Sequence, residues 1–265
     1  MNLRCVGLMS GSRTVAATLV VVTVSVMLAS CATLPEDAEE RAEVQKLNDP
    51  LEPANRRVYE FNRAFAATVL RPFVDAYNSA EMRPISEPFS NVLHNLRSPL
   101  IFANDFAQGR LCAAGQTLQR FLLNSTIGVA GLYDFAGREA GIMRHENSVA
   151  QTLSVWGVPE GSYLVLPLLG PSNVRGATGL GVEFLLDPTD LAFSALGFSN
   201  LIIVRTVAEV FDDQANSLGD LDKLEKSSLD GYAALRSAYR QHEADQFSES
   251  DCTERPLRQV TARTE

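Results

Sequence analysis

Apolar residues recur at intervals of three or four through the first part of this chain's body. The series is Val58, Phe61, Phe65, Val69, Phe73 and Tyr77. That spacing predicts a long helix with one apolar face. Asp49 can cap its start with Pro50 at the first helical position, and Pro72, late in the series, predicts a kink or an end.

A helical pattern continues from Pro84 to Leu123, where prolines such as Pro99 interrupt it. Short helices separated by prolines are predicted there rather than strands. Residues 124–137 are rich in small side chains, which let backbones approach closely.

The second half alternates between glycine-rich and apolar stretches. Residues 157–181 are dense in Gly and Pro around one apolar run, which predicts a structured surface loop. The apolar stretch 191–204 has 14 residues, too few to span a bilayer, and is expected to be a core, re-entrant or interfacial segment. One striped helix is then predicted from Leu218, Leu221, Leu224, Tyr232, Leu235 and Tyr239.

The N-terminus has the parts of a secretory signal. Two arginines precede an apolar run, residues 14–28, which ends in small residues. Leu28-Ala29-Ser30-Cys31 is similar to the lipobox of bacterial lipoproteins, in which the cysteine is diacylated and the chain is cut before it. The alternative is an ordinary signal or an uncleaved anchor, but a run of 15 residues is short for about 30 Å of hydrocarbon. We therefore expect residues 1–30 to be removed and Cys31 to carry the lipid.

The residues after the lipid site indicate where the anchor lies. Residue 32 is Ala, where Asp commonly retains such lipoproteins in the inner membrane, so the sorting rule predicts the periplasmic face of the outer membrane. Residues 31–47 form a polar, charged tether. Removal of the signal takes the formal net charge from −9 to −11, which disfavours nucleic-acid partners.

Two cysteines remain in the body of the mature chain. In an oxidising periplasm Cys112 and Cys252 can pair and pin the C-terminal tail, or they can be two unrelated thiols. Spacing alone does not decide between these readings, because it says nothing about proximity.

Candidate catalytic chemistry is sparse. His94, His145 and His242 lie far apart without metal-ligand spacing, so we expect surface or helix-flank histidines, no metal and no cofactor. Ser172, His145 and Asp134 can be drawn as a triad, but no G-x-S-x-G motif supports it. A chain with little site chemistry, tied to a membrane, is expected to handle lipid or hold a complex together rather than to be an enzyme.

Ordered sequence blocks over roughly residues 48–190 resemble the MlaA (VacJ) lipoproteins. The most specific block runs from Gln151-Thr152-Leu153 through Trp156-Gly157-Val158 to Gly170-Pro171-Ser172. Other matching blocks are Asn48-Asp49-Pro50-Leu51-Glu52, Asn55-Arg56, Phe61-Asn62, Asn91-Val92, Asn95-Leu96, Asn104-Asp105, Gln108-Gly109, Arg120-Phe121 and Asn124-Ser125-Thr126-Ile127-Gly128.

The resemblance implies a mainly α fold: a single helical ring-like domain with short kinked helices, lying in the inner leaflet of the outer membrane. It would occupy residues 48–247, with a polar tail at 248–265. It implies an amphipathic channel that takes mislocalised glycerophospholipid from the outer leaflet and passes it to a soluble periplasmic carrier, beside an outer-membrane porin trimer. A structural envelope lipoprotein and a lipid hydrolase are the alternatives.

For channel lining or membrane contact we single out residues from the glycine-rich region and the apolar stretch: Trp156, Tyr163, Leu164, Leu166, Pro167, Leu201, Ile202 and Ile203.

Overall fold

The computed structural model describes residues 49–248. The predicted signal, the lipid site Cys31, the tether and the tail beyond residue 248 lie outside the described residues. The chain divides into two units, Met1–Ala54 and Asn55–Glu265. The boundary between the units falls in the first turn of the first described helix.

That helix runs as three consecutive segments: α3 (Glu52–Phe65), the π-helix η1 (Ala66–Leu70) and α4 (Arg71–Tyr77). Pro50 lies in the turn before α3, so its predicted place at the first helical position is wrong. The helix changes geometry just before Pro72, where the backbone N–H of Arg71 donates to the carbonyl of Ala66, five residues back. A ring without an N–H disturbs the regular ladder there, as the sequence predicted.

The next two helices, α5 (Arg83–Ala107) and α6 (Leu111–Thr126), pack against each other. The prediction of several short, proline-separated helices is wrong here, because α5 continues through Pro88 and Pro99. Proline removes one backbone donor per ring, and tertiary packing along α6 outweighs that loss.

The glycine-rich region is more ordered than the surface loop that the sequence predicted. It follows α7 (Phe135–Arg138) and α8 (Val149–Val155) and contains an antiparallel hairpin, β1 (Tyr163–Leu166) and β2 (Gly170–Asn173). Leu166 pairs with Gly170, and the three residues between them form its tip. The region ends inside α9 (Val174–Leu186), whose N-cap Asn173 accepts from the backbone N–H of Gly176.

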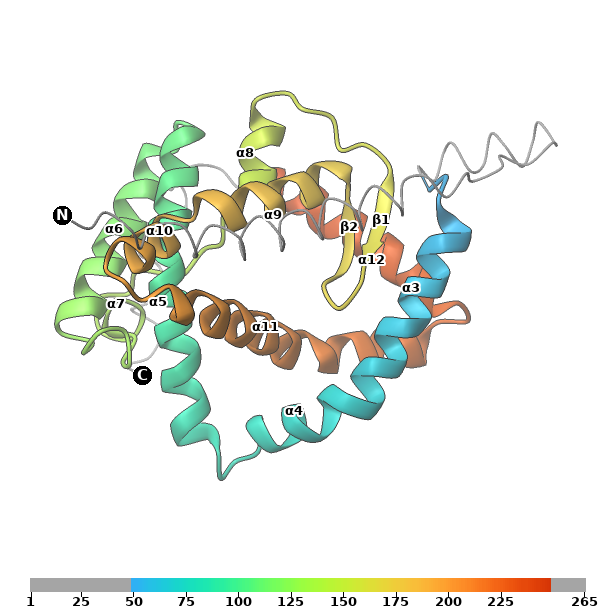
Figure 1. Cartoon of the computed structure of the whole chain (residues 1–265), viewed down its shortest axis with the longest axis horizontal. Coiled ribbons are helices and arrows are strands. Elements are labelled where there is room, and N and C mark those ends of the chain that lie inside the picture. The colour runs from blue at the N-terminus through green and yellow to red at the C-terminus, as the bar shows by residue number, and fades with distance from the viewer. Residues whose placement is uncertain (1–48, 249–265) are drawn as a thin grey trace, which may run out of the picture. The chain divides into compact units, whose positions relative to one another are not determined.

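Three helices complete the described chain: α10 (Pro188–Ala195), α11 (Ser199–Ser227) and α12 (Gly231–Ser248). The apolar stretch 191–204 is therefore divided between α10 and α11. The predicted striped helix is also two helices, since residues 228–230 separate α11 from α12. Figure 1 shows α11 running across the second unit, with α4 on one side, α9 and the hairpin on the other, and α3 passing near its C-terminal end.

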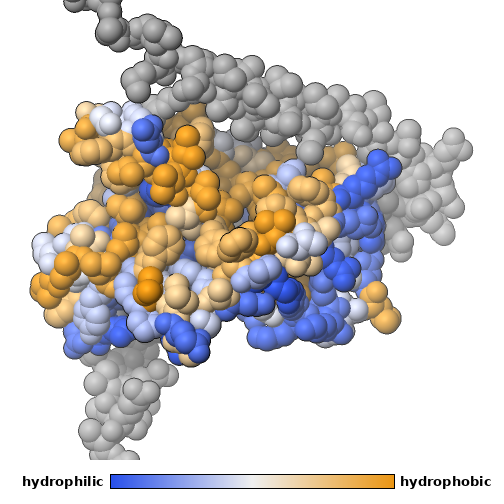
Figure 2. All heavy atoms as spheres, turned by 60° about the horizontal axis from the view of Figure 1, so that its bottom comes forward, coloured by the Kyte–Doolittle hydropathy of each residue, from blue (hydrophilic) through white to orange (hydrophobic). Residues whose placement is uncertain are grey.

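The distribution of side chains is unusual. Among residues 49–248, the buried set holds more polar than apolar residues, while many large apolar side chains are exposed. Phe61 and Phe73, which belong to the predicted apolar face of the first helix, are 52% and 65% exposed. Figure 2 shows apolar residues covering much of one face, with hydrophilic residues gathered toward one edge. Exposed apolar surface on this scale indicates a partner or a membrane.

The buried polar groups are held by bonds between helices. Arg205 of α11 is an example: its Nη2 donates to Oδ2 of Asp187 and its Nη1 to Oδ1 of Asp190, both at 2.8 Å. Such pairing is what makes a buried charge tolerable. No helix within residues 49–248 combines the length and the apolarity needed to cross a bilayer.

Candidate functional site

A cavity of about 630 Å³ opens between α3, η1, the hairpin and the second half of α11. Its volume lies within the range of pockets that hold small-molecule or cofactor ligands. The elements that border it are far apart in the sequence, and the start of α12 closes one side through Gly231 and Leu235. The cavity therefore exists only in the assembled fold.

The walls of the cavity are largely apolar. Four elements contribute them, and the larger aliphatic side chains concerned are Leu70, Val165, Leu168, Leu169, Leu218, Leu221, Leu224 and Leu235. Leu218 is buried, together with Val74 and Ala215, in a small core against which Ala66 and Leu70 pack. Such walls suit a hydrocarbon chain, since they offer it no hydrogen-bonding group to desolvate.

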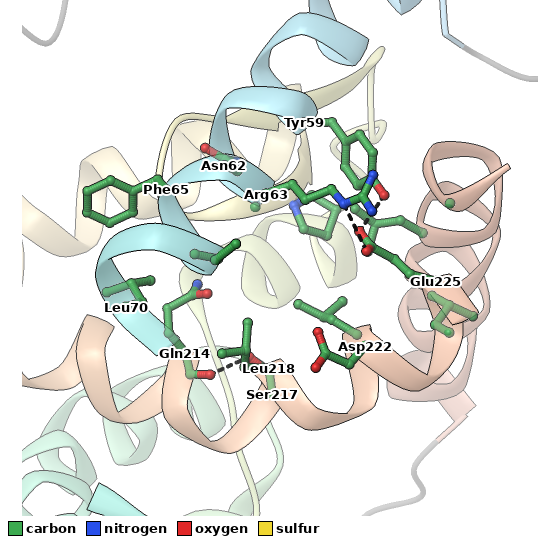
Figure 3. Close-up of a pocket in the computed structure, with 18 of the residues that line it drawn as sticks. Tyr59, Asn62, Arg63, Phe65, Leu70, Gln214, Ser217, Leu218, Asp222 and Glu225 are labelled. Atoms are coloured by element: carbon green, nitrogen blue, oxygen red, sulfur yellow. Dashed lines mark hydrogen bonds and ion pairs between the residues drawn. The ribbon is translucent and has the colours of Figure 1, made fainter. Parts of the chain in front are cut away.

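One charged cluster lies on α3 and α11 at the cavity. Arg63 Nε lies 3.1 Å from Oε2 of Glu225, and the Tyr59 hydroxyl donates to Oε1 of Glu225 at 2.5 Å. Figure 3 shows Arg63 and Glu225 pointing toward each other, with Asp222 beside them. Burial and the bond to Glu225 raise the pKa of Tyr59, so this hydroxyl stays protonated.

A second ion pair lies one helical turn earlier on α11. Arg71 Nη2 donates to Oδ1 of Asp222 at 2.6 Å. The hydrogen bond to Asp222 raises the pKa of Arg71, and the same bond lowers the pKa of Asp222, so both groups are charged at neutral pH. Lys226 also borders the cavity. Together these residues give an otherwise apolar cavity a charged rim.

The hairpin is attached to α3 by two asparagines. Asn55 donates to the carbonyl of Tyr163 and accepts from the N–H of Val165, at 3.0 and 2.9 Å. Asn62 repeats the arrangement with the carbonyl of Leu166 and the N–H of Leu168, at 2.9 and 2.8 Å. Each amide satisfies two backbone groups that the two-stranded sheet leaves unpaired. These bonds position the hairpin tip over the cavity.

The predicted channel or membrane residues do not line this cavity. Tyr163 and Ile202 are buried at 3% and 7% exposure, whereas Trp156 and Ile203 are 64% and 70% exposed. Trp156 keeps a bond, since its Nε1 donates to the carbonyl of Ala107. Leu164 and Leu166 are half-buried, and Pro167 and Leu201 are exposed. Membrane contact by the exposed members stays a prediction.

Two of the histidines, for which a surface or helix-flank position was predicted, are mostly buried beside a carboxylate. His94 Nδ1 lies 3.1 Å from Glu146, with 13% of its side chain exposed. His145 Nε2 lies 2.8 Å from the buried Asp105, with 16% of its side chain exposed. Within residues 49–248, no three His, Cys, Asp or Glu side chains form a group that could hold a metal.

The drawn triad has no support in these contacts. His145 is bonded to Asp105, while Asp134 accepts from Arg120 and Asn124. Ser172 Oγ is bonded to the carbonyl of Asn173. Cys112 lies in the first turn of α6, and Cys252 lies outside the described residues, so their pairing stays a prediction.

Sequence patterns missed the charged rim entirely. The two partners of each ion pair, such as Arg63 and Glu225, lie more than 150 residues apart along the chain, and no motif joins them. The sequence feature that pointed toward the cavity was the pair Asn55 and Asn62. Both lie in the blocks shared with the family, and the fold places both against the hairpin.

These features define a mainly helical protein with an amphipathic cavity and an apolar exterior. The family model described as "MlaA lipoprotein" matches residues 47–246. The chain therefore belongs to the MlaA lipoprotein family, and the resemblance seen in the sequence is confirmed.

Relatives and a solved structure agree with that assignment. A Rickettsia bellii protein, described as uncharacterized, is 30% identical over 198 residues, 74% of this chain and 76% of its own length. The Escherichia coli K12 protein, named "Intermembrane phospholipid transport system lipoprotein MlaA", is 30% identical over 220 residues, 81% of this chain and 82% of its own. A chain solved under "Structural basis for maintenance of bacterial outer membrane lipid asymmetry" matches with TM-score 0.62 and 31% identity, covering 73% of this chain and 96% of that one.

Proposed function

We propose that this protein is an outer-membrane lipoprotein that takes mislocalised glycerophospholipids from the outer leaflet and passes them to a soluble periplasmic carrier. The observation that carries the proposal is the cavity of about 630 Å³ with apolar walls and a charged rim. Moving a phospholipid between leaflets is opposed mainly by taking its polar headgroup through hydrocarbon. A cavity that offers polar partners to the head and apolar walls to a tail lowers that barrier without covalent chemistry.

The exterior supports a position within one leaflet. Apolar side chains with more than 40% exposure follow one another along α9, α10 and the start of α11: Leu180, Phe184, Leu185, Leu186, Leu191, Leu196, Phe198, Leu201, Ile203, Val204 and Val207. Hydrocarbon can cover such a surface at no cost in desolvated polar groups, because helices satisfy their backbone internally. Diacyl lipid on Cys31 would hold the body there from the periplasmic side.

The remaining parts of the proposal come from the family. The Escherichia coli relative is named as part of an intermembrane phospholipid transport system. We assign this chain to such a system, with a porin trimer beside it in the outer membrane and a soluble lipid carrier on the periplasmic side.

The test is deletion of the gene from the host bacterium. Phospholipid is expected to accumulate in the outer leaflet and detergent sensitivity to rise, with both effects reversed by the complete chain. A Cys31→Ala variant is expected to fail to restore asymmetry, because it lacks the anchor. A deletion strain with normal asymmetry would overturn the proposal in favour of a passive envelope lipoprotein. Hydrolysis of phospholipid by the purified chain, lost on Ser172→Ala, would favour a hydrolase.

A further inference from the structure

We propose that Arg63 and Arg71 bind the phosphodiester of the lipid in transit, and that Glu225 and Asp222 compete for the same guanidinium groups and so release it. The inference rests on the proposed function and adds to it a specific headgroup site.

The four charged side chains lie around one cavity. Arg63 and Arg71 come from α3 and α4, while Asp222 and Glu225 come from successive positions on one face of α11. All four border the same cavity, whose walls beyond them are aliphatic. A lipid with its chain against Leu218 and Leu221 therefore has its glycerophosphate in reach of this rim.

Both arginines keep donors that their ion pairs do not use. A guanidinium has five N–H donors and binds phosphate well. The contact between Arg63 and Glu225 uses Nε, and the contact between Arg71 and Asp222 uses Nη2. In each pair the arginine side chain is more exposed than the carboxylate. Arg63 is 65% exposed against 27% for Glu225, and Arg71 is 40% exposed against 25% for Asp222.

The charges around the cavity also favour an anion. The cavity is bordered by three cations, Arg63, Arg71 and Lys226, and by two carboxylates, Asp222 and Glu225. The excess of one positive charge attracts a phosphate ester, which every glycerophospholipid carries and diacylglycerol lacks. The carboxylates weaken that attraction, which suits a site that must also let its occupant leave.

This arrangement predicts opposite effects from the two sides of one ion pair. Arg71→Gln removes a phosphate donor and should weaken phospholipid binding about tenfold, the equivalent of one charge-assisted hydrogen bond. Asp222→Asn breaks the same pair but frees Arg71, so it should strengthen binding by a similar factor and slow release. A merely structural role for the pair predicts that both variants weaken binding alike.

The experiment measures binding of pyrene-labelled phosphatidylethanolamine, phosphatidylglycerol and diacylglycerol to the full purified chain in detergent. Arg63→Gln and Glu225→Gln form a second matched pair, in case Arg71→Gln or Asp222→Asn fails to fold by circular dichroism. Opposite shifts for both phospholipids, with diacylglycerol unmoved, are the expected result. Equal shifts within each pair, or diacylglycerol shifting with the phospholipids, would overturn the headgroup site. Phospholipid that binds the wild-type chain but is insensitive to all four variants also overturns it while leaving the proposed function standing, whereas failure of every phospholipid to bind the wild-type chain contradicts both.

Discussion

Asn55 and Asn62 lie seven residues apart on α3, about two helical turns, and each bonds to the hairpin backbone through both ends of its amide. The spacing puts both side chains on one face of the helix. The rise of the helix between the two asparagines matches the rise of the hairpin between the backbone groups that they bind.

Replacement of Asn55 should therefore loosen the hairpin. Asn55→Ala leaves one buried carbonyl and one buried N–H without partners and should cost about 2–4 kcal/mol of unfolding free energy. Urea unfolding in detergent measures this cost, and hydrogen exchange should show faster exchange at Val165. Asn200→Ala, at an exposed position of α11, is the matched control. Equal stability of the two variants would mean that Asn55 does not hold the hairpin.

Two glycines of α9 should respond oppositely to alanine. A Cβ on Gly179 would lie 2.7 Å from the backbone N of Ala150 in α8, whereas a Cβ on Gly181 would have no atom within 4 Å. Gly179→Ala should destabilise the protein by about 1–3 kcal/mol through overpacking. Gly181→Ala should stabilise it by about 0.5–1 kcal/mol, because alanine favours the helix. Thermal unfolding of both variants checks this, and a stable Gly179→Ala variant would show that α8 and α9 do not pack as described.

His94 should make stability depend on pH. Burial lowers the pKa of His94, and the neighbouring Arg144 and Arg120 lower it further, while Glu146 partly opposes them. Because the unfolded chain takes up the proton at higher pH than the fold does, stability falls as pH drops from about 6.5 toward the lowered folded pKa.

The same measurement on His94→Gln isolates this effect. Glutamine does not titrate, so the variant should lose less stability than the wild type over that interval. Urea midpoints measured at several pH values between 7.5 and 5 provide the comparison. Parallel curves for the two proteins would show that His94 contributes nothing to the pH dependence.

The helical character of the chain can be predicted from the local sequence pattern, but the ends of the helices cannot. The spacing of Val58, Phe65 and Tyr77 predicted the α3–α4 run, and Pro72 predicted its irregularity. The prolines of this region led to a prediction of helix breaks that α5 does not have. Its contact with α6 outweighs the backbone donors that are missing at Pro88 and Pro99. The break between α11 and α12 was missed because its apolar spacing happens to carry across it.

Burial and the site were the least predictable. Periodicity identifies an apolar face, but it does not say what covers that face, and Phe61 and Phe73 on the predicted apolar face are exposed. The rim pairs Arg63 with Glu225 and Arg71 with Asp222 across more than 150 residues, so only the folded chain brings them together. The blocks shared with the family located the hairpin region without showing that Val165, Leu168 and Leu169 are the cavity walls.

The central claim is that lipid passes through this cavity, and blocking it tests the claim most directly. Ala67 of η1 lines the cavity, and Ala64 of α3 is an exposed alanine outside its lining. Outer-leaflet phospholipid is measured in the deletion strain carrying Ala67→Trp or Ala64→Trp at equal protein level. We predict that Ala64→Trp restores asymmetry and Ala67→Trp does not, because the indole fills the passage. Full restoration by Ala67→Trp would contradict a route through the cavity.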